Sequence, residues 1–366
     1  MSGSSPLGLD AGSWHGGDRW PAERERHAAT WLSWPHNKET WPSGLVPIED
    51  AFCEIVRAIV PGETVKINVE DAAMAAHVRE RLRASGVEVD GAVELFLIPS
   101  DDAWVRDHGG IFVVEAEAGA DAKGPHRWRK RLLDFAFDTW GGKYPPWDLD
   151  AAVARAMAQA AGVEVISSDI VLEASAIEGD GQGTILTTES CLLNPNRLRP
   201  GQDRSREGME ALLAESFGAR RVLWLGDGIE GDDTDGHVDD LTRFIAPGRV
   251  VTCIEGDRSD PNFVPLAENR RRLKGFRDAR DRSLEIIELP MPGRIQMSTH
   301  RLPASYANFY IANSALLVPV FGVDADREAL SILEDCFPSR VIVAIESRAL
   351  IEGLGAVHCL TQQEPV

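Results

Sequence analysis

Cys359 and His237 are the two residues of this chain whose side chains could act together as a nucleophile and a proton carrier. Cys359 follows the segment 353–355, which holds two glycines, so little side-chain bulk precedes the thiol. His237 lies in the segment 231–240, where five carboxylates surround the single imidazole. A thiolate is a strong nucleophile, and an imidazole can carry the protons that such chemistry moves. A cysteine taken alone is more often an inert core residue, as Cys53 in an apolar helical segment illustrates.

The segment 101–110 has the residue types that a cation would need. The indole of Trp104 can cover a cation, and the carboxylate of Asp107 can accept a pair of its N–H bonds. The structural alternative is that this aspartate only shapes the turn before Gly109. Glu173, which follows another apolar run, is open to three interpretations: a contact with a substrate tail, a structural ion pair, or a direct catalytic role.

A metal centre is the main competing interpretation of the acidic segment. Asp235, His237 and Asp239 have the D-x-H-x-D spacing of binuclear ureohydrolases. Two-metal sites need further carboxylates from another strand. The D-x-D pairs at 148–150 and 324–326 instead stand where helices begin, a common place for a capping aspartate. We therefore expect neither a metal nor another cofactor.

Alternating short apolar runs and amphipathic segments predict the elements that must position these side chains. Helices are expected at 49–60, 71–85, 149–161, 204–217, 264–281, 325–336 and 347–353. Strands are expected at 64–69, 93–98, 110–114, 132–137, 163–166, 183–188, 221–225, 242–245, 249–254, 284–289, 315–320 and 341–345, with a hairpin turn at 180–183.

The loops that hold the candidate residues recur at similar intervals. Asp107, Glu173 and His237 are 66 and 64 residues apart, and Cys359 follows 122 residues later, about twice that interval. One intervening unit near 298–305 would make five modules. Modules arranged around an axis would bring equivalent loops together. An open α/β sheet with accidental spacing is the alternative.

The composition indicates which partners the protein can bind and in which compartment it is expected. The 366 residues carry 58 acidic and 38 basic side chains, a net charge of -20 that opposes nucleic acid and anionic membranes and favours a small cation. Five cysteines without a CxxC pair indicate a reducing compartment, and no run of about 18 apolar residues is long enough to cross a membrane. We expect a flexible tail at 1–18 without a secretory signal, a single domain at 19–366, and a cytoplasmic location.

Several segments together resemble the agmatine deiminase family, which includes the bacterial-type peptidylarginine deiminases. The similar segments, in chain order from about Trp20 onward, are 21–23, 30–35, 104–109, 235–240, 305–313 and 358–363. The resemblance implies an α/β fold with five blades, the pseudo-fivefold propeller called a pentein. It implies that Cys359 is the nucleophile, that His237 is the general acid and base, and that Asp107 and Asp239 hold a guanidinium group. It also suggests a homodimer.

The expected activity is hydrolysis of agmatine to N-carbamoylputrescine and ammonia through a covalent amidino-cysteine, without a cofactor. Trp104, Asp235 and Glu173 complete the expected substrate-binding set. Peptidylarginine or another arginine derivative is the alternative substrate. An amidinotransferase, a metal-dependent ureohydrolase and a non-catalytic propeller that only binds a ligand are the other interpretations. Two departures from the family pattern concern the substrate tail: Ala174-Ser175-Ala176 stands where family members have Gly-Gly-Ser, and Leu354 and Ala356 stand in a segment that is usually Gly-Gly-Gly-Asn.

Overall fold

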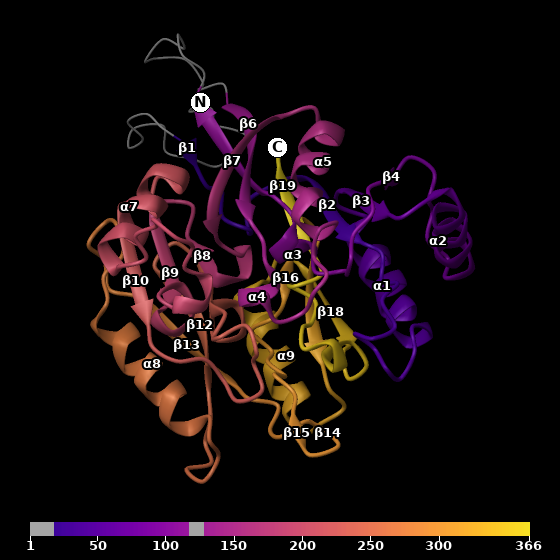
Figure 1. Cartoon of the computed structure of the whole chain (residues 1–366). Coiled ribbons are helices and arrows are strands. Elements are labelled where there is room, and N and C mark those ends of the chain that lie inside the picture. The colour runs from indigo at the N-terminus through magenta and orange to yellow at the C-terminus, as the bar shows by residue number, and fades with distance from the viewer. Residues whose placement is uncertain (1–17, 117–127) are drawn as a thin grey trace, which may run out of the picture.

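The computed structural model describes residues 18–116 and 128–366. Within them the fold is mixed α/β, with several small sheets and no closed barrel (Figure 1). Two sheets have four strands: β1 (Asp18–Arg19), β5 (Ile111–Ala116), β6 (Trp128–Ala136) and β7 (Glu164–Val171) form one, and β19 (Gln362–Pro365), β2 (His27–Ser33), β3 (Thr64–Val69) and β4 (Val93–Leu97) form the other.

Three further sheets have three strands each, in the described part of the chain. They consist of β8 (Ile177–Gly179), β9 (Thr184–Thr188) and β10 (Arg221–Leu225); of β11 (Thr242–Ala246), β12 (Arg249–Ile254) and β13 (Glu285–Pro290); and of β16 (Tyr310–Ile311), β17 (Ala315–Val320) and β18 (Val341–Glu346). A separate ribbon joins β14 (Gln296–Met297) to β15 (His300–Arg301).

All five of these larger sheets repeat one connection. An antiparallel pair is followed by a helix that leads to a strand parallel to the second member, as in β5, β6, α5 and β7. Parallel strands need such a crossover because the end of one strand and the start of the next lie at opposite ends of the sheet. In the sheet that contains β2, the antiparallel partner is the C-terminal β19, so the two ends of the chain close one sheet together.

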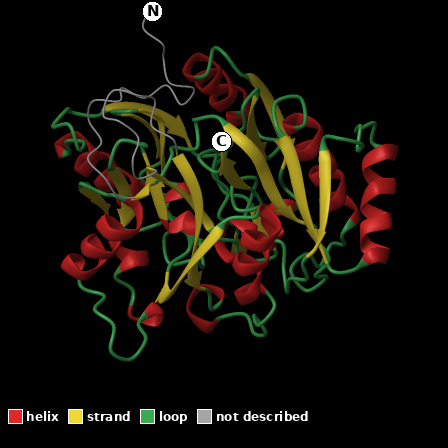
Figure 2. Cartoon of the chain, turned by 90° about the horizontal axis from the view of Figure 1, so that it is seen from above, coloured by secondary structure: helices red, strands yellow, loops and turns green. Residues whose placement is uncertain are grey.

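The longer helices lie on the outside of the molecule, and the strands and loops lie further in (Figure 2). They are α1 (Val46–Ile59), α2 (Ala72–Ala84), α5 (Asp150–Ala161), α7 (Arg206–Phe217), α8 (Phe263–Gly275) and α9 (Ala325–Cys336). Single turns are α3 (Val105–His108), α4 (Thr139–Gly142), α6 (Glu189–Leu192), η1 (Ala174–Ala176), η2 (Pro195–Arg197), η3 (Val238–Asp240) and η4 (Leu350–Gly353). None of the helices in the described ranges is long and apolar enough to cross a membrane.

The predicted elements agree with the structure where the hydrophobic period is clear. The hairpin at 180–183 is present, with Gly181 and Gly183 at φ of 73° and 91°. The helix expected at 264–281 ends at Gly275, and the segment expected as a helix at 347–353 forms only the short η4. The tail expected at 1–18 lies outside the described residues except for Asp18, whose backbone pairs in β1.

A buried network of charged side chains connects these sheets. Glu23 Oε1 lies 2.9 Å from Arg243 Nη2, and its Oε2 lies 3.2 Å from Arg106 Nη2 and 2.7 Å from His358 Nε2. Arg243 Nε in turn donates to Glu178 Oε2 at 3.0 Å. All five side chains are buried. Buried charges are tolerated only when they are paired, so each member depends on the others.

We expect Arg243→Met to lower the free energy of unfolding by about 3–5 kcal/mol, because it leaves Glu23 and Glu178 buried beside each other without this cation. Arg249→Met is the matched control on the neighbouring strand, since Arg249 pairs with Glu285 at the exposed surface, and should cost less than about 1 kcal/mol. Urea denaturation followed by tryptophan fluorescence measures both. Equal costs would show that the buried network does not contribute more than a surface pair.

Candidate functional site

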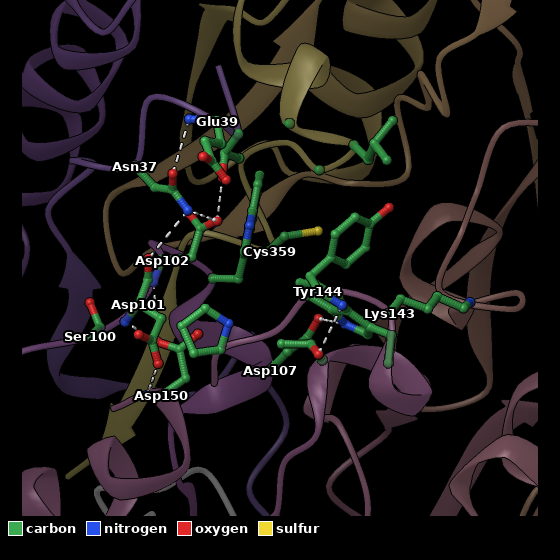
Figure 3. A pocket seen from close by; sticks show the side chains of 18 of the residues that line it. Asn37, Glu39, Ser100, Asp101, Asp102, Asp107, Lys143, Tyr144, Asp150 and Cys359 are labelled. Carbon is green, nitrogen blue, oxygen red and sulfur yellow. Dashed lines mark hydrogen bonds between the residues drawn. The ribbon is translucent and has the colours of Figure 1, made fainter. Parts of the chain in front are cut away.

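A cavity of about 880 Å³ contains three of the residues that the sequence singled out: Cys359, Asp107 and Trp104. Figure 3 shows the sulfur of Cys359 and the carboxylate of Asp107 on the side of the pocket nearest Tyr144, and a group of acidic residues on the other side. This second group consists of Asp101, Asp102 and Asp150. Burial raises the pKa of Asp102 to about 6 and that of Asp150 to about 7.

The loop that holds Cys359 packs directly on the segment that holds Asp107. The backbone N–H of Arg106 in α3 donates to the carbonyl of Cys359 at 3.2 Å. A Cβ on Gly353 or Gly355 would lie 2.8 Å and 2.5 Å from ring atoms of Trp104, so only glycine allows this approach. Leu354, between them, has a φ of 69° and lines the cavity.

Asp107 is held from two directions and keeps its carboxylate in the cavity. Its Oδ2 accepts a hydrogen bond from Trp140 Nε1 at 2.9 Å, and its Oδ1 accepts one from the backbone N–H of Ser175 at 3.2 Å. The same Oδ2 lies 3.8 Å from His237 Nδ1. Ser175 therefore contributes its backbone here, and this contact does not require the glycines that the family resemblance leads one to expect near this position.

Asp239 lies close to Cys359, and its Oδ2 is 3.8 Å from the Cys359 Sγ. That oxygen also faces His358 Nδ1 at 2.7 Å and accepts from Asn308 Nδ2 at 3.2 Å. The other oxygen, Oδ1, is buried without a hydrogen-bond partner. A buried acceptor without a partner is costly, so this atom is prepared for a donor that comes from a ligand.

The thiol of Cys359 is protonated in the free protein at neutral pH. Burial raises its pKa well above that of an ordinary thiol, and the nearby carboxylates of Asp239, Asp240 and Asp107 raise it further. Asn308 Nδ2 donates to the sulfur at 3.2 Å. The local field therefore opposes a thiolate until a positive charge enters the cavity.

The surroundings of His237, in contrast to those of Cys359, favour the charged form of the side chain. Burial alone would lower its pKa, but Asp107 and the nearby Cys191 and Glu173 outweigh burial and hold the pKa well above the usual value. The imidazole is therefore charged at neutral pH and can give a proton to a nearby group.

Four of the predicted site residues are not among the residues that line the cavity: Glu173, Asp235, His237 and Asp239. Arg197 pairs with the first two: its Nε lies 3.0 Å from Glu173 Oε1, and its Nη1 bonds to Asp235. Asp235 also accepts from Lys143 Nζ at 3.0 Å. The structure thus places Glu173 in a buried ion pair, one of the three interpretations that the sequence allowed.

The three residues of the D-x-H-x-D spacing face different partners. Asp235 pairs with Arg197, His237 faces Asp107, and Asp239 faces His358. Because these side chains do not converge, the arrangement does not fit the binuclear centre of a ureohydrolase.

Sequence reasoning missed the residues that support the site. Trp140 lies in α4 at a φ of 59°, and Asn308 was noted only as part of a similar segment. His358, likewise noted only within a similar segment, lies in a turn, and its ring bridges Asp239 and Glu23. Pairing over such sequence distances leaves no local signal.

The chain resembles known proteins along nearly its whole length. The family model described as Porphyromonas-type peptidyl-arginine deiminase matches residues 19–365. An agmatine deiminase of Ectopseudomonas mendocina (strain ymp) is 36% identical over 368 residues, covering 94% of this chain and 95% of the relative.

Solved structures of agmatine deiminases are also similar to this chain over nearly its whole length. The agmatine deiminase of Enterococcus faecalis matches with a TM-score of 0.86 at 32% identity, covering 100% of this chain and 98% of that chain. A cysteine-to-serine variant of the agmatine deiminase of C. jejuni with substrate bound matches with a TM-score of 0.82 at 29% identity, covering 95% of this chain and 96% of that chain.

The raised pKa of Cys359 gives a direct test. Only the thiolate reacts with iodoacetamide, so alkylation of Cys359 in the free protein should be slow near pH 7 and should accelerate with rising pH. We expect its midpoint above that of an ordinary thiol, about 8.5. Peptide mass spectrometry follows the reaction at this residue, with Cys359→Ser as the blank. A midpoint below that of a reference peptide thiol would contradict the electrostatic description.

Proposed function

The chain belongs to the Porphyromonas-type peptidyl-arginine deiminase family, and we propose that it hydrolyses agmatine to N-carbamoylputrescine and ammonia. One observation supports this proposal most strongly. Carboxylates of Asp107 and Asp239 lie near a buried thiol, Cys359, and raise its pKa, and one oxygen of Asp239 lacks a partner. A planar cation with several N–H groups would neutralise both carboxylates and supply the missing donor.

Binding of the guanidinium group prepares the nucleophile. The charges that raise the pKa of Cys359 include Asp239 and Asp107, and the bound cation offsets both. The thiol then releases its proton to solvent, and the resulting thiolate can attack the bound carbon. The carboxylates fix that carbon close to the sulfur, which removes much of the entropic cost of the encounter.

Two half-reactions follow. The sulfur of Cys359 forms a bond to the guanidinium carbon, and His237 gives its proton to the departing amino group, which leaves as ammonia. The carbon remains attached to sulfur as an amidino-thioether. A water molecule then attacks the same carbon while His237 takes one of its protons. The carbon–sulfur bond breaks, the second proton of the water passes to the departing sulfur, and the neutral ureido product leaves. His237, with its raised pKa, begins in the charged form that the first step needs.

The repeated sheets support a finer description of the fold. We propose that the five sheets that share the antiparallel pair, helix and parallel strand are five blades around one axis, within a single domain from residue 19 onward. The N- and C-terminal strands β2 and β19 complete one blade between them. The loops of several blades would then meet at the cavity.

Product analysis separates this proposal from its rivals. We expect purified protein to release ammonia and a ureido product from agmatine, with a chelator present throughout. Cys359→Ala should fold normally by circular dichroism but show no turnover. Urea as product, or activity lost with the chelator, would favour the metal hydrolase. Turnover of peptidyl-arginine but not of agmatine would instead identify the alternative substrate.

Asp107 and Asp235 form a matched pair of tests. Asp107→Asn removes a charge within the cavity and should lower kcat/KM for agmatine by at least about 100-fold, as loss of a charge-stabilising contact in a buried site does. Asp235→Asn removes a charge that already pairs with Arg197 and Lys143, so we expect a loss of less than about 10-fold. Steady-state kinetics measure both variants. Similar losses would restore Asp235 to the substrate-binding set.

A further inference from the structure

Three buried side chains with different ligand atoms converge beside His237. One ring nitrogen of His237, the sulfur of Cys191 and a carboxylate oxygen of Glu173 all lie within 4.8 Å of one another. They come from separate segments: Glu173 precedes η1, Cys191 lies in α6, and His237 precedes η3. All three residues are at most 1% exposed, so solvent does not compete for these atoms.

Two of the three side chains have a polar atom that nothing in the protein satisfies. His237 Nε2 and Glu173 Oε2 are buried without a hydrogen-bond partner. Such atoms are rare in folded proteins, and each one needs a physical explanation. Cys191 is a free thiol, positioned by the bond from its backbone N–H to Thr188 Oγ1 at 3.3 Å. The cluster is therefore more than a chance group of acids or an isolated cysteine.

We propose that Glu173, Cys191 and His237 form a binding site for Zn²⁺ and that the bound ion inhibits the enzyme. A thiolate, an imidazole and a carboxylate are all ligands that zinc accepts, and three protein ligands leave a fourth position for water. Binding releases the thiol proton, and any proton on the coordinating nitrogen, to solvent. For tetrahedral bonds of about 2.0–2.3 Å the ligand atoms must approach to roughly 3.5 Å of one another, a contraction of about one ångström.

The surroundings of the cluster suit a divalent cation. Arg197 Nε holds Glu173 Oε1 at 3.0 Å and leaves Oε2 free, an outer contact that fixes the carboxylate for a metal. Asp107 Oδ2 lies 3.8 Å from His237 Nδ1 and adds negative charge on the other side of the ring. Asp107 also lines the cavity, so this carboxylate connects the cavity to the buried cluster, whose three residues do not line it.

The inhibitory effect rests on the proposed function, whereas binding itself does not. A coordinated nitrogen of His237 can no longer exchange a proton with the leaving ammonia or the attacking water. Zn²⁺ at this position is thus an antagonist of turnover and not a cofactor. A chelator should preserve activity rather than remove it.

Co²⁺ reports on this site without any assay of activity. Coordination by a thiolate gives a charge-transfer absorption in the near ultraviolet that other ligands of the cluster do not give. We expect the whole protein to bind a single equivalent of Co²⁺ with this absorption, and Zn²⁺ to displace it. Cys359→Ser should keep the absorption, because its sulfur lies outside the cluster, whereas Cys191→Ser should lose it.

Two further measurements guard against misfolding and against a different site. Circular dichroism and thermal unfolding check that Cys191→Ser is folded, and Glu173→Gln, which keeps the thiol, should weaken Co²⁺ binding at least tenfold. Absorption that persists in Cys191→Ser or disappears in Cys359→Ser would overturn the proposal, as would equal binding by all variants. If Co²⁺ binds as expected but agmatine is not hydrolysed, the proposed function fails and the metal site remains.

Discussion

The structure depends on one buried carboxylate, that of Glu23. Its two oxygens face the side chains of Arg243, Arg106 and His358, and Oε1 also accepts from the backbone N–H of Ile311. Burial alone would raise the pKa of Glu23, but Arg243, His358 and Arg106 outweigh burial and hold it well below its usual value. The carboxylate therefore stays charged. Because a buried charge without partners is too costly, β11, α3, β16 and the segment before β19 must all be in place together.

This network also sets the geometry of the reactive groups. His358 connects Glu23 to Asp239 through its two ring nitrogens, each 2.7 Å from a carboxylate oxygen. Asp239 thereby uses Oδ2 within the protein and keeps Oδ1 for a ligand. Asp107, whose charge also acts on the thiol, is fixed by Trp140, so neither carboxylate has to reorganise when a cation arrives.

The sequence allowed the reactive residues and most of the regular elements to be predicted, but not the supports. Strands such as 64–69 and helices such as 325–336 have a clear hydrophobic period, and the structure contains them. β2 was missed as a strand because it is buried on both faces and shows no alternation. Trp140, Asn308 and His358 contact Asp107 or Asp239 from segments at least 33 residues away, so no local pattern records their roles.

The same charges that recruit a guanidinium cation weaken the nucleophile in its absence. Asp239 and Asp107 would hold the substrate, yet in the empty cavity they add to burial in raising the pKa of Cys359. His237 meanwhile stays charged, because Asp107 and Glu173 outweigh its burial. In the free enzyme the pKa shifts therefore favour the thiol form of Cys359 and the charged form of His237. Since only a positive ligand reverses the field at sulfur, a neutral urea of the same shape would leave the thiol protonated. The enzyme would then discriminate between substrate and product by charge as well as by shape. The neutral ureido product would bind the two carboxylates more weakly than the cationic substrate does.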